Sequence, residues 1–223
     1  MDAGERILWG IATSRAIRAH WALHELGLSY RTEPIRTRTP LMKDPRFLAV
    51  SPRGKIPVLQ DGGLTLAESA AIVAWLGTIY RDRAPYLVPP DPAARARYDE
   101  WSYFVMTELD ATSLYILRRH VDLHAIYGEA PVAVRSAEAY FGRQIGVVER
   151  ALADGRLFLL GDDFSGADIL LTSCLIWAQR CGLPLSAPVE AYRARMVARP
   201  AYATARAVCY PPEQPVAASE GQA

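Results

Sequence analysis

Residues 51–76 read SPRGKIPVLQDGGLTLAESAAIVAWL, and they contain the most informative local signals of the chain. We predict a strand that opens at Ile56 and Pro57, a tight turn at residues 61–63, a second short strand, and a helix that starts at residues 68–69. A cis peptide bond costs little before proline, and here it would leave the backbone N–H and C=O of Ile56 facing outward. The start of the helix offers free N–H groups and a positive dipole to a carboxylate. We therefore expect a receptor for a short peptide that carries a free amine and a free carboxylate.

The chain divides into a first part with strands and a second part with helices only. In the first part, the order of elements is thioredoxin-like, with strands at 6–10, 29–35, 56–60 and 64–67, a short helical turn at 44–49, and helices at 14–26 and 68–80. In the second part, helices are predicted at 93–119, 131–153, 165–180, 188–198 and 200–208.

Between these parts, residues 81–92 contain four prolines and break the helical pattern. We therefore expect a thioredoxin-like domain over 1–80, a linker over 81–92, an all-helical domain over 93–208 and a disordered tail over 209–223. The helix over 165–180 is apolar nearly all round, which indicates burial, and Ser165 with Asp168 forms a capping box at its start.

Composition excludes several classes of function. The net charge of +1 provides no basic field for nucleic acid. The three cysteines form no disulfide framework, and their odd number favours a reducing cytosol. Neither a signal peptide nor a membrane-spanning stretch is visible, so we expect a soluble cytoplasmic protein.

Four segments resemble the cytosolic glutathione transferases. Lys55-Ile56-Pro57-Val58-Leu59 followed by Glu68-Ser69-Ala70-Ala71-Ile72 is similar to the signature of their glutathione-binding domain. Residues 12–28 resemble the first-helix segment of bacterial members with a Thr-Ser opening. Residues 164–171 resemble the buried capping-box helix, and residues 199–202 resemble the start of the last helix. The order and spacing of the four segments strengthen the resemblance, which implies a bacterial, Ser/Thr-type member that is theta- or zeta-like.

The resemblance implies a two-domain fold, in which a thioredoxin-like domain precedes an all-helical domain. It also implies a homodimer that forms through the apolar face of the long first helix of the second domain. The implied reaction is attack of the glutathione thiolate on a hydrophobic electrophile, by addition or by displacement of halide, as in detoxification. Glutathione is then the co-substrate, and no metal, nucleic acid or membrane is involved.

The resemblance assigns each end of glutathione to a residue. Ser69 binds the γ-glutamyl carboxylate, and Glu68 pairs with the free amine. Ile56 forms two backbone hydrogen bonds to the cysteinyl part, while Pro57 sets the geometry. Lys55 reaches the glycyl carboxylate, and Lys43 and Arg53 are rival cations for that end. Each residue also has a simpler interpretation: a helix cap at 68–69, a trans proline in an edge strand, or a solvated lysine.

Activation of the sulfur is expected from the turn before the first helix. A free thiol has a pKa of about 8.5, so a hydroxyl that donates to the thiolate is needed to favour the charged form. Ser14 is the first candidate and Thr13 the second, although a serine here also serves as a helix cap. An alternative alignment anchored on Arg15 places Ile11, which has no hydroxyl, at the catalytic position. No tyrosine or cysteine occupies the turn, which argues against tyrosine-type classes and disulfide chemistry.

Pocket residues for the electrophile have no motif. Met106 and Thr107 are the candidates, on a helix crowded with aromatic residues that are more often core than pocket. Two alternatives stay open: a glutathione-dependent isomerase or dehalogenase on the same fold, and a non-catalytic binding or assembly module. None of the four histidines has a carboxylate or cysteine partner at ligand spacing, so we assign no metal site.

Overall fold

The computed structural model describes residues 5–212. Its first half contains β1 (Ile7–Trp9), α1 (Ala16–Glu25), β2 (Arg31–Glu33), η1 (Pro40–Lys43), α2 (Pro45–Val50), β3 (Val58–Asp61), β4 (Leu64–Ala67) and α3 (Ser69–Ile79). The predicted elements occur in the predicted order, β4 at its predicted bounds and the others with boundaries moved by a few residues, and η1 is additional. The predicted tail lies almost wholly outside the described residues, although the last helix extends to the buried Cys209.

One four-stranded mixed sheet organises this half, with strand order β2-β1-β3-β4. β1 pairs with β2 in parallel, and β3 pairs with both β1 and β4 antiparallel. Gly62 has φ +59°, a left-handed conformation that glycine adopts freely, and it closes the turn between β3 and β4. The predicted thioredoxin-like layout is confirmed.

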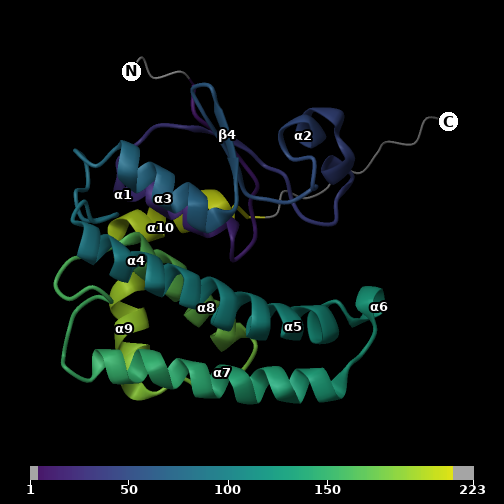
Figure 1. Cartoon of the computed structure of the whole chain (residues 1–223). Coiled ribbons are helices and arrows are strands. Elements are labelled where there is room, and N and C mark those ends of the chain that lie inside the picture. Colours follow the sequence, from purple (N-terminus) through teal and green to yellow (C-terminus); the bar gives the residue numbers. More distant parts are fainter. Residues whose placement is uncertain (1–4, 213–223) are drawn as a thin grey trace.

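The second half is entirely helical among the described residues. It contains α4 (Pro92–Phe104), η2 (Val105–Leu114), α5 (Tyr115–Leu117), η3 (Arg118–Asp122), α6 (His124–Tyr127), α7 (Pro131–Leu152), α8 (Gly166–Arg180), α9 (Ala187–Val197) and α10 (Pro200–Cys209). Figure 1 shows the run from α4 to α5 lying across the middle of the molecule, with α7 along its base and α1, α3 and β4 above. The predicted helical half is therefore confirmed.

The predicted helix over 93–119 differs in one respect. It continues to Asp122, and two parts of it, η2 and η3, are π-helical, with a wider turn than an α-helix. The prediction assumed the α-helical period throughout, whereas a π-helix joins residues five apart, so the widening was not predicted. The π-helical parts carry Asp110 and Arg118, which both lie in the region of the candidate site.

A single large apolar core extends through both halves. Helix α8 lies at its centre, and twelve of its residues are buried. The predicted capping box is present: the Asp168 carboxylate accepts hydrogen bonds from the Ser165 N–H at 2.8 Å and from the Ser165 hydroxyl at 2.9 Å. Helix α1 packs against α3, α8 and α10, so the first half is held against the second through this helix.

Within residues 5–212, none of the helices combines the length and the apolar character that crossing a bilayer requires.

Candidate functional site

Sheet register brings the Ile56-Pro57 corner next to the start of α3. Val58 pairs with Ala67, so Pro57 and Glu68, the next residue along each strand, lie at the same end of the hairpin. The Ile56–Pro57 peptide bond is cis, as predicted. No backbone hydrogen bond of Ile56 to a described residue is present, so its N–H and C=O are open to a ligand.

Gly10 allows the close approach of this corner to β1. A Cβ atom on Gly10 would lie 2.5 Å from the Ile56 Cβ, and Gly10 has φ +114°, which disfavours any other residue.

The start of α3 carries the two predicted anchors, Glu68 and Ser69. Glu68 has φ +70°, a conformation that is rare for a residue with a side chain. Its exposed carboxylate pairs with the guanidinium of Arg53 at 3.0 Å. The Ser69 side chain is buried, and its hydroxyl oxygen lies 3.2 Å from a guanidinium nitrogen of Arg18. The N-terminus of α3 thus combines backbone N–H groups with a nearby buried cation.

The turn before α1 separates the two candidate hydroxyls. The Thr13 hydroxyl accepts a hydrogen bond from the Ala16 N–H at 2.9 Å, so Thr13 caps α1. The Ser14 hydroxyl makes no hydrogen bond to any described residue and lines a cavity. The N–H of Ala12 donates to the carbonyl of Cys209 at 2.8 Å, which joins the turn to the end of α10.

A buried ionic cluster lies behind this turn. The Asp110 carboxylate accepts hydrogen bonds from both Arg15 and Arg18, and the Arg18 Nη2 to Asp110 Oδ2 distance is 2.7 Å. Arg18 also donates to the Ser173 hydroxyl at 2.6 Å. Burial opposes the charge of Asp110, but the two guanidinium groups outweigh it and lower the pKa of the carboxyl. The side chains of this cluster therefore link α1, η2 and α8, with Asp110 and the two arginines in their charged forms.

A cavity of about 450 Å³ opens beside the turn, a size in the usual range for small-ligand sites. The first half contributes Lys55, Ile56 and the turn residues, and the second half contributes Tyr115, Trp177 and several charged residues. Among the described residues that line it, the basic ones are Arg15, Arg38, Lys55, Arg118 and Arg180, and the single acidic one is Asp122. Burial and the nearby Arg38 and Arg15 lower the pKa of Arg118.

A second cavity, of about 390 Å³, adjoins the first. The two cavities share Ala12, Ser14 and Arg180, and the second one extends toward Tyr202 and Tyr210. Ser14 therefore stands between two open volumes.

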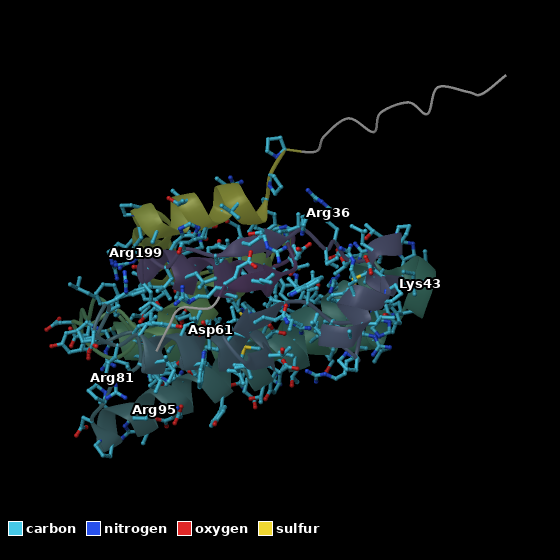
Figure 2. All side chains as sticks on the ribbon, turned by 90° about the horizontal axis from the view of Figure 1, so that it is seen from above. Arg36, Lys43, Asp61, Arg81, Arg95 and Arg199 are labelled. Carbon is cyan, nitrogen blue, oxygen red and sulfur yellow. The ribbon has the colours of Figure 1, made fainter. Side chains whose placement is uncertain are left out.

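The structure brings some of the predicted site residues together and separates others. Thr13, Ser14, Lys55 and Ile56 line the first cavity. Glu68 and Ser69 do not line it, and they lie at the adjoining end of the hairpin. Lys43 is exposed and lies at the outer edge of the molecule, at the opposite end from Arg199 (Figure 2).

Met106 and Thr107, the candidate pocket residues, line neither cavity. The Met106 sulfur accepts a hydrogen bond from the Arg18 guanidinium at 3.1 Å, and the Met106 side chain packs against the core. The Thr107 hydroxyl is exposed and donates to the carbonyl of Tyr103 at 2.9 Å. The second half instead lines the first cavity with residues of α5, η3 and α8, among them Tyr115, Arg118, Trp177 and Arg180. No sequence signal identified them, because their roles depend on how three helices meet.

The cysteines are unsuited to nucleophilic chemistry at this site. Burial raises the pKa of Cys174 to about 12 and that of Cys209 to about 11. Within residues 5–212, none of the cysteines lines either cavity, and no group of three metal-binding side chains is found.

Two protein-family models match this chain, one over its sheet-containing part and one mainly over its helical part. The family "Glutathione S-transferase, N-terminal domain" matches residues 14–79. The family "Glutathione S-transferase, C-terminal domain" matches residues 66–203. Among curated proteins, the chain is 31% identical to glutathione S-transferase 3 of Zea mays, over 92% of this chain and 95% of the relative.

Solved structures give the same result. The chain is similar to the theta class glutathione S-transferase of Xanthomonas axonopodis pv. citri, which was solved with glutathione bound. That likeness has a TM-score of 0.74 and 28% identity, and it covers 90% of this chain and 96% of the other. A glutathione transferase from Methylococcus capsulatus has a TM-score of 0.76 and 26% identity, over 91% of this chain and 98% of the other. Ure2p in complex with glutathione, at 23% identity and a TM-score of 0.81, shares the fold.

Proposed function

The chain belongs to the glutathione S-transferase family, a family of enzymes with glutathione as co-substrate, and we propose that it conjugates the glutathione thiolate to a hydrophobic electrophile. The thiolate attacks an electrophilic carbon, and a carbon–sulfur bond forms. In a displacement the halide leaves with its bonding electron pair; in an addition the electron pair moves onto the acceptor, which then takes up a proton. The protein lowers the pKa of the thiol, orients the sulfur and holds the acceptor beside it.

Glutathione lies along the sheet half in this proposal. Its γ-glutamyl carboxylate is bound by Ser69 at the start of α3, and its amine is bound by Glu68. The cysteinyl part pairs with the open backbone of Ile56. The glycyl carboxylate reaches Lys55, the cation beside that corner in the cavity. Arg53 is already paired with Glu68, and Lys43 is outside the cavity, which leaves Lys55 as the better of the three candidates for the glycyl end.

The observation that carries the proposal is the difference between two adjacent hydroxyls. Thr13 accepts the bond from the Ala16 N–H and acts as the helix cap, so the cap does not need Ser14. The Ser14 hydroxyl is left to donate to a sulfur in the cavity that it lines. A hydrogen bond from Ser14, together with the positive end of α1, favours the thiolate over the thiol. Ser14 is therefore the residue that activates glutathione.

In this proposal the two halves of the chain bind the two substrates. Residues 1–80 bind glutathione, residues 81–92 connect the halves, and residues 93–208 supply the wall for the acceptor. Tyr115 and Trp177 provide the apolar surface that a hydrophobic electrophile needs. We place the enzyme in the cytoplasm as a homodimer, which is the usual assembly of the family.

Substitution of the two hydroxyls tests the proposal. Ser14→Ala is expected to lower kcat with chlorodinitrobenzene by about a hundredfold, the usual cost of one preorganised donor to a developing or resident anion. Ultraviolet difference absorbance is expected to show that the pKa of bound glutathione rises in that variant. Thr13→Ala is expected to lower stability by about 1 kcal/mol through loss of the cap and to keep most of the activity.

Three results would count against parts of the proposal. Full activity in Ser14→Ala with loss of activity in folded Thr13→Ala would transfer the role to Thr13. Retention on a glutathione resin without turnover of any acceptor would favour a binding module. Absence of glutathione binding would remove the proposal altogether.

A further inference from the structure

Two arginines of the helical half face the cavity without a partner. Arg118 lies on η3 and Arg180 at the end of α8. Among the described residues, neither forms an ion pair or a side-chain hydrogen bond, and Asp122 lies beyond ion-pair distance of both. A half-buried guanidinium such as Arg118 has given up part of its hydration and receives no ion pair or hydrogen bond in exchange until an anion binds.

The surroundings of Arg118 add to this cost. The charged and titratable groups that face it are Arg15, Arg38, Tyr115 and Asp122. The charge of Arg15 is only partly balanced by Asp110, since the Asp110 carboxylate also accepts from Arg18. One carboxylate shared by two guanidinium groups still leaves an excess of positive charge in the cavity wall. Like charges gathered in a concave site focus the field and attract an anion.

The two carboxylates of glutathione do not account for Arg118 and Arg180. In the function proposed above, on which this inference depends, one carboxylate lies at Ser69 and the other at Lys55. Both positions belong to the sheet half. Arg118 and Arg180 instead share their wall with the aromatic rings of Tyr115 and Trp177, where the acceptor lies.

We propose that the electrophilic substrate carries an anionic group, of the carboxylate class, on an aromatic or other apolar body, and that Arg118 with Arg180 binds this group. A planar guanidinium matches a carboxylate with two parallel hydrogen bonds. Tyr115 and Trp177 cover the apolar body. The natural acceptor is thus a hydrophobic electrophile that also carries an acid group.

Product analogues test this without the need for turnover. The probes are S-(para-carboxybenzyl)glutathione and its benzoate methyl ester, which differ by one charge, and the measurement is the Kd of each by calorimetry. The unsubstituted protein is expected to bind the acid about tenfold more tightly than the ester, a modest value for a charge-assisted hydrogen bond. In Arg118→Gln and in Arg180→Gln the preference is expected to fall to about twofold or less.

A matched control separates the local effect from loss of net charge. Arg135 is exposed on α7 and lines neither cavity, so Arg135→Gln removes the same charge elsewhere and is expected to keep the tenfold preference. The Kd of glutathione itself is expected to stay within about twofold in Arg118→Gln, since glutathione uses the other half. Conjugation of chlorodinitrobenzoate and its methyl ester, as kcat/KM, is expected to follow the same order.

The outcomes separate the two proposals. Equal binding of acid and ester by the unsubstituted protein would overturn the anionic acceptor and leave the transferase proposal intact. Equal weakening of glutathione, acid and ester in Arg118→Gln would also overturn it, because Arg118 would then hold glutathione. If glutathione itself does not bind to the unsubstituted protein, the transferase proposal fails first. Arg180→Gln keeps the test decisive if Arg118→Gln does not fold, because Arg180 is exposed.

Discussion

The imidazole of His20 is fully buried on α1. Its Nε2 lies 3.1 Å from the carbonyl of Gly10, which can only accept, so this nitrogen carries the proton. Its Nδ1 accepts from the Tyr30 hydroxyl at 2.8 Å. Burial, reinforced by His24, lowers the pKa of His20 to about 4, so the ring is neutral in the folded protein.

Stability is therefore expected to depend on pH through His20. In the unfolded chain the ring titrates near its ordinary pKa of about 6.5, so below that pH the unfolded state binds more protons than the folded state. The contribution is complete above about pH 6.5 and is lost as the pH falls toward about 4. Between about pH 7.5 and about pH 5, the free energy of unfolding is expected to fall by about 2 kcal/mol more in the unsubstituted protein than in His20→Gln.

Urea denaturation at the two pH values measures this difference. His124→Gln, on the exposed helix α6, serves as the control and is expected to keep the pH dependence of the unsubstituted protein. Equal pH dependence in the protein and in His20→Gln would show that this ring has the same pKa in the folded protein as in the unfolded chain.

Single residues show how far the sequence supported the site. The motif around residues 55–69 predicted that Ile56-Pro57 and the start of α3 lie together, as the sheet register places them, because strand pairing and helix starts are local properties. The choice between Thr13 and Ser14 stayed open, since it depends on which hydroxyl reaches the Ala16 N–H. That choice is set by the turn backbone, where Ala12 has φ +59°. Arg118 and Arg180 were not predicted at all, because each lies far along the sequence from the other half of the cavity.

Helix α8 shows which features of a whole helix can be predicted from its own sequence. Its apolar sequence and its capping box were both predicted, and both are confirmed. Two further hydrogen bonds to the Asp168 carboxylate were not predicted, from the Leu159 N–H at 2.8 Å and from the Tyr192 hydroxyl at 2.6 Å. These come from segments on either side of the helix, so the cap also fixes a loop and α9.

Asp168→Ala is accordingly expected to cost more than loss of an ordinary cap. The substitution leaves buried donors of Ser165, Leu159 and Tyr192 without an acceptor, and the expected loss of stability is about 3 kcal/mol or more. Asp91 provides the matched control, since it caps α4 through the Ala94 N–H at the surface. Asp91→Ala is expected to cost about 1 kcal/mol. Similar losses in the two variants, measured by chemical denaturation, would mean that the tertiary bonds of Asp168 contribute little.

The two halves of the chain meet around one buried carboxylate. Asp110, from the helical half, accepts hydrogen bonds from Arg15, just before α1, and from Arg18 of α1, and Arg18 also contacts Ser69 and Ser173. Hydrophobic periodicity predicted both halves, but it carries no information on which polar side chains face each other across them. The contact nevertheless joins the turn that carries Ser14, on one half, to the helical half that lines the other side of the cavity.

Asp110→Asn is expected to loosen this junction. The change removes the negative charge from beside two guanidinium groups, and breaking one partner of a buried ion pair costs about 3–5 kcal/mol. Because the pKa of Asp110 is lowered in the folded protein, its contribution is complete above about pH 4 and is lost as the pH falls through the folded value. The variant is therefore expected to show a lower free energy of unfolding at neutral pH and a weaker loss of stability in acid.

Glu100→Gln, which breaks the exposed pair with Arg97, is the control and is expected to change neither quantity measurably. Full stability of Asp110→Asn at neutral pH, with unchanged acid denaturation, would show that the two halves are held together by the apolar core alone.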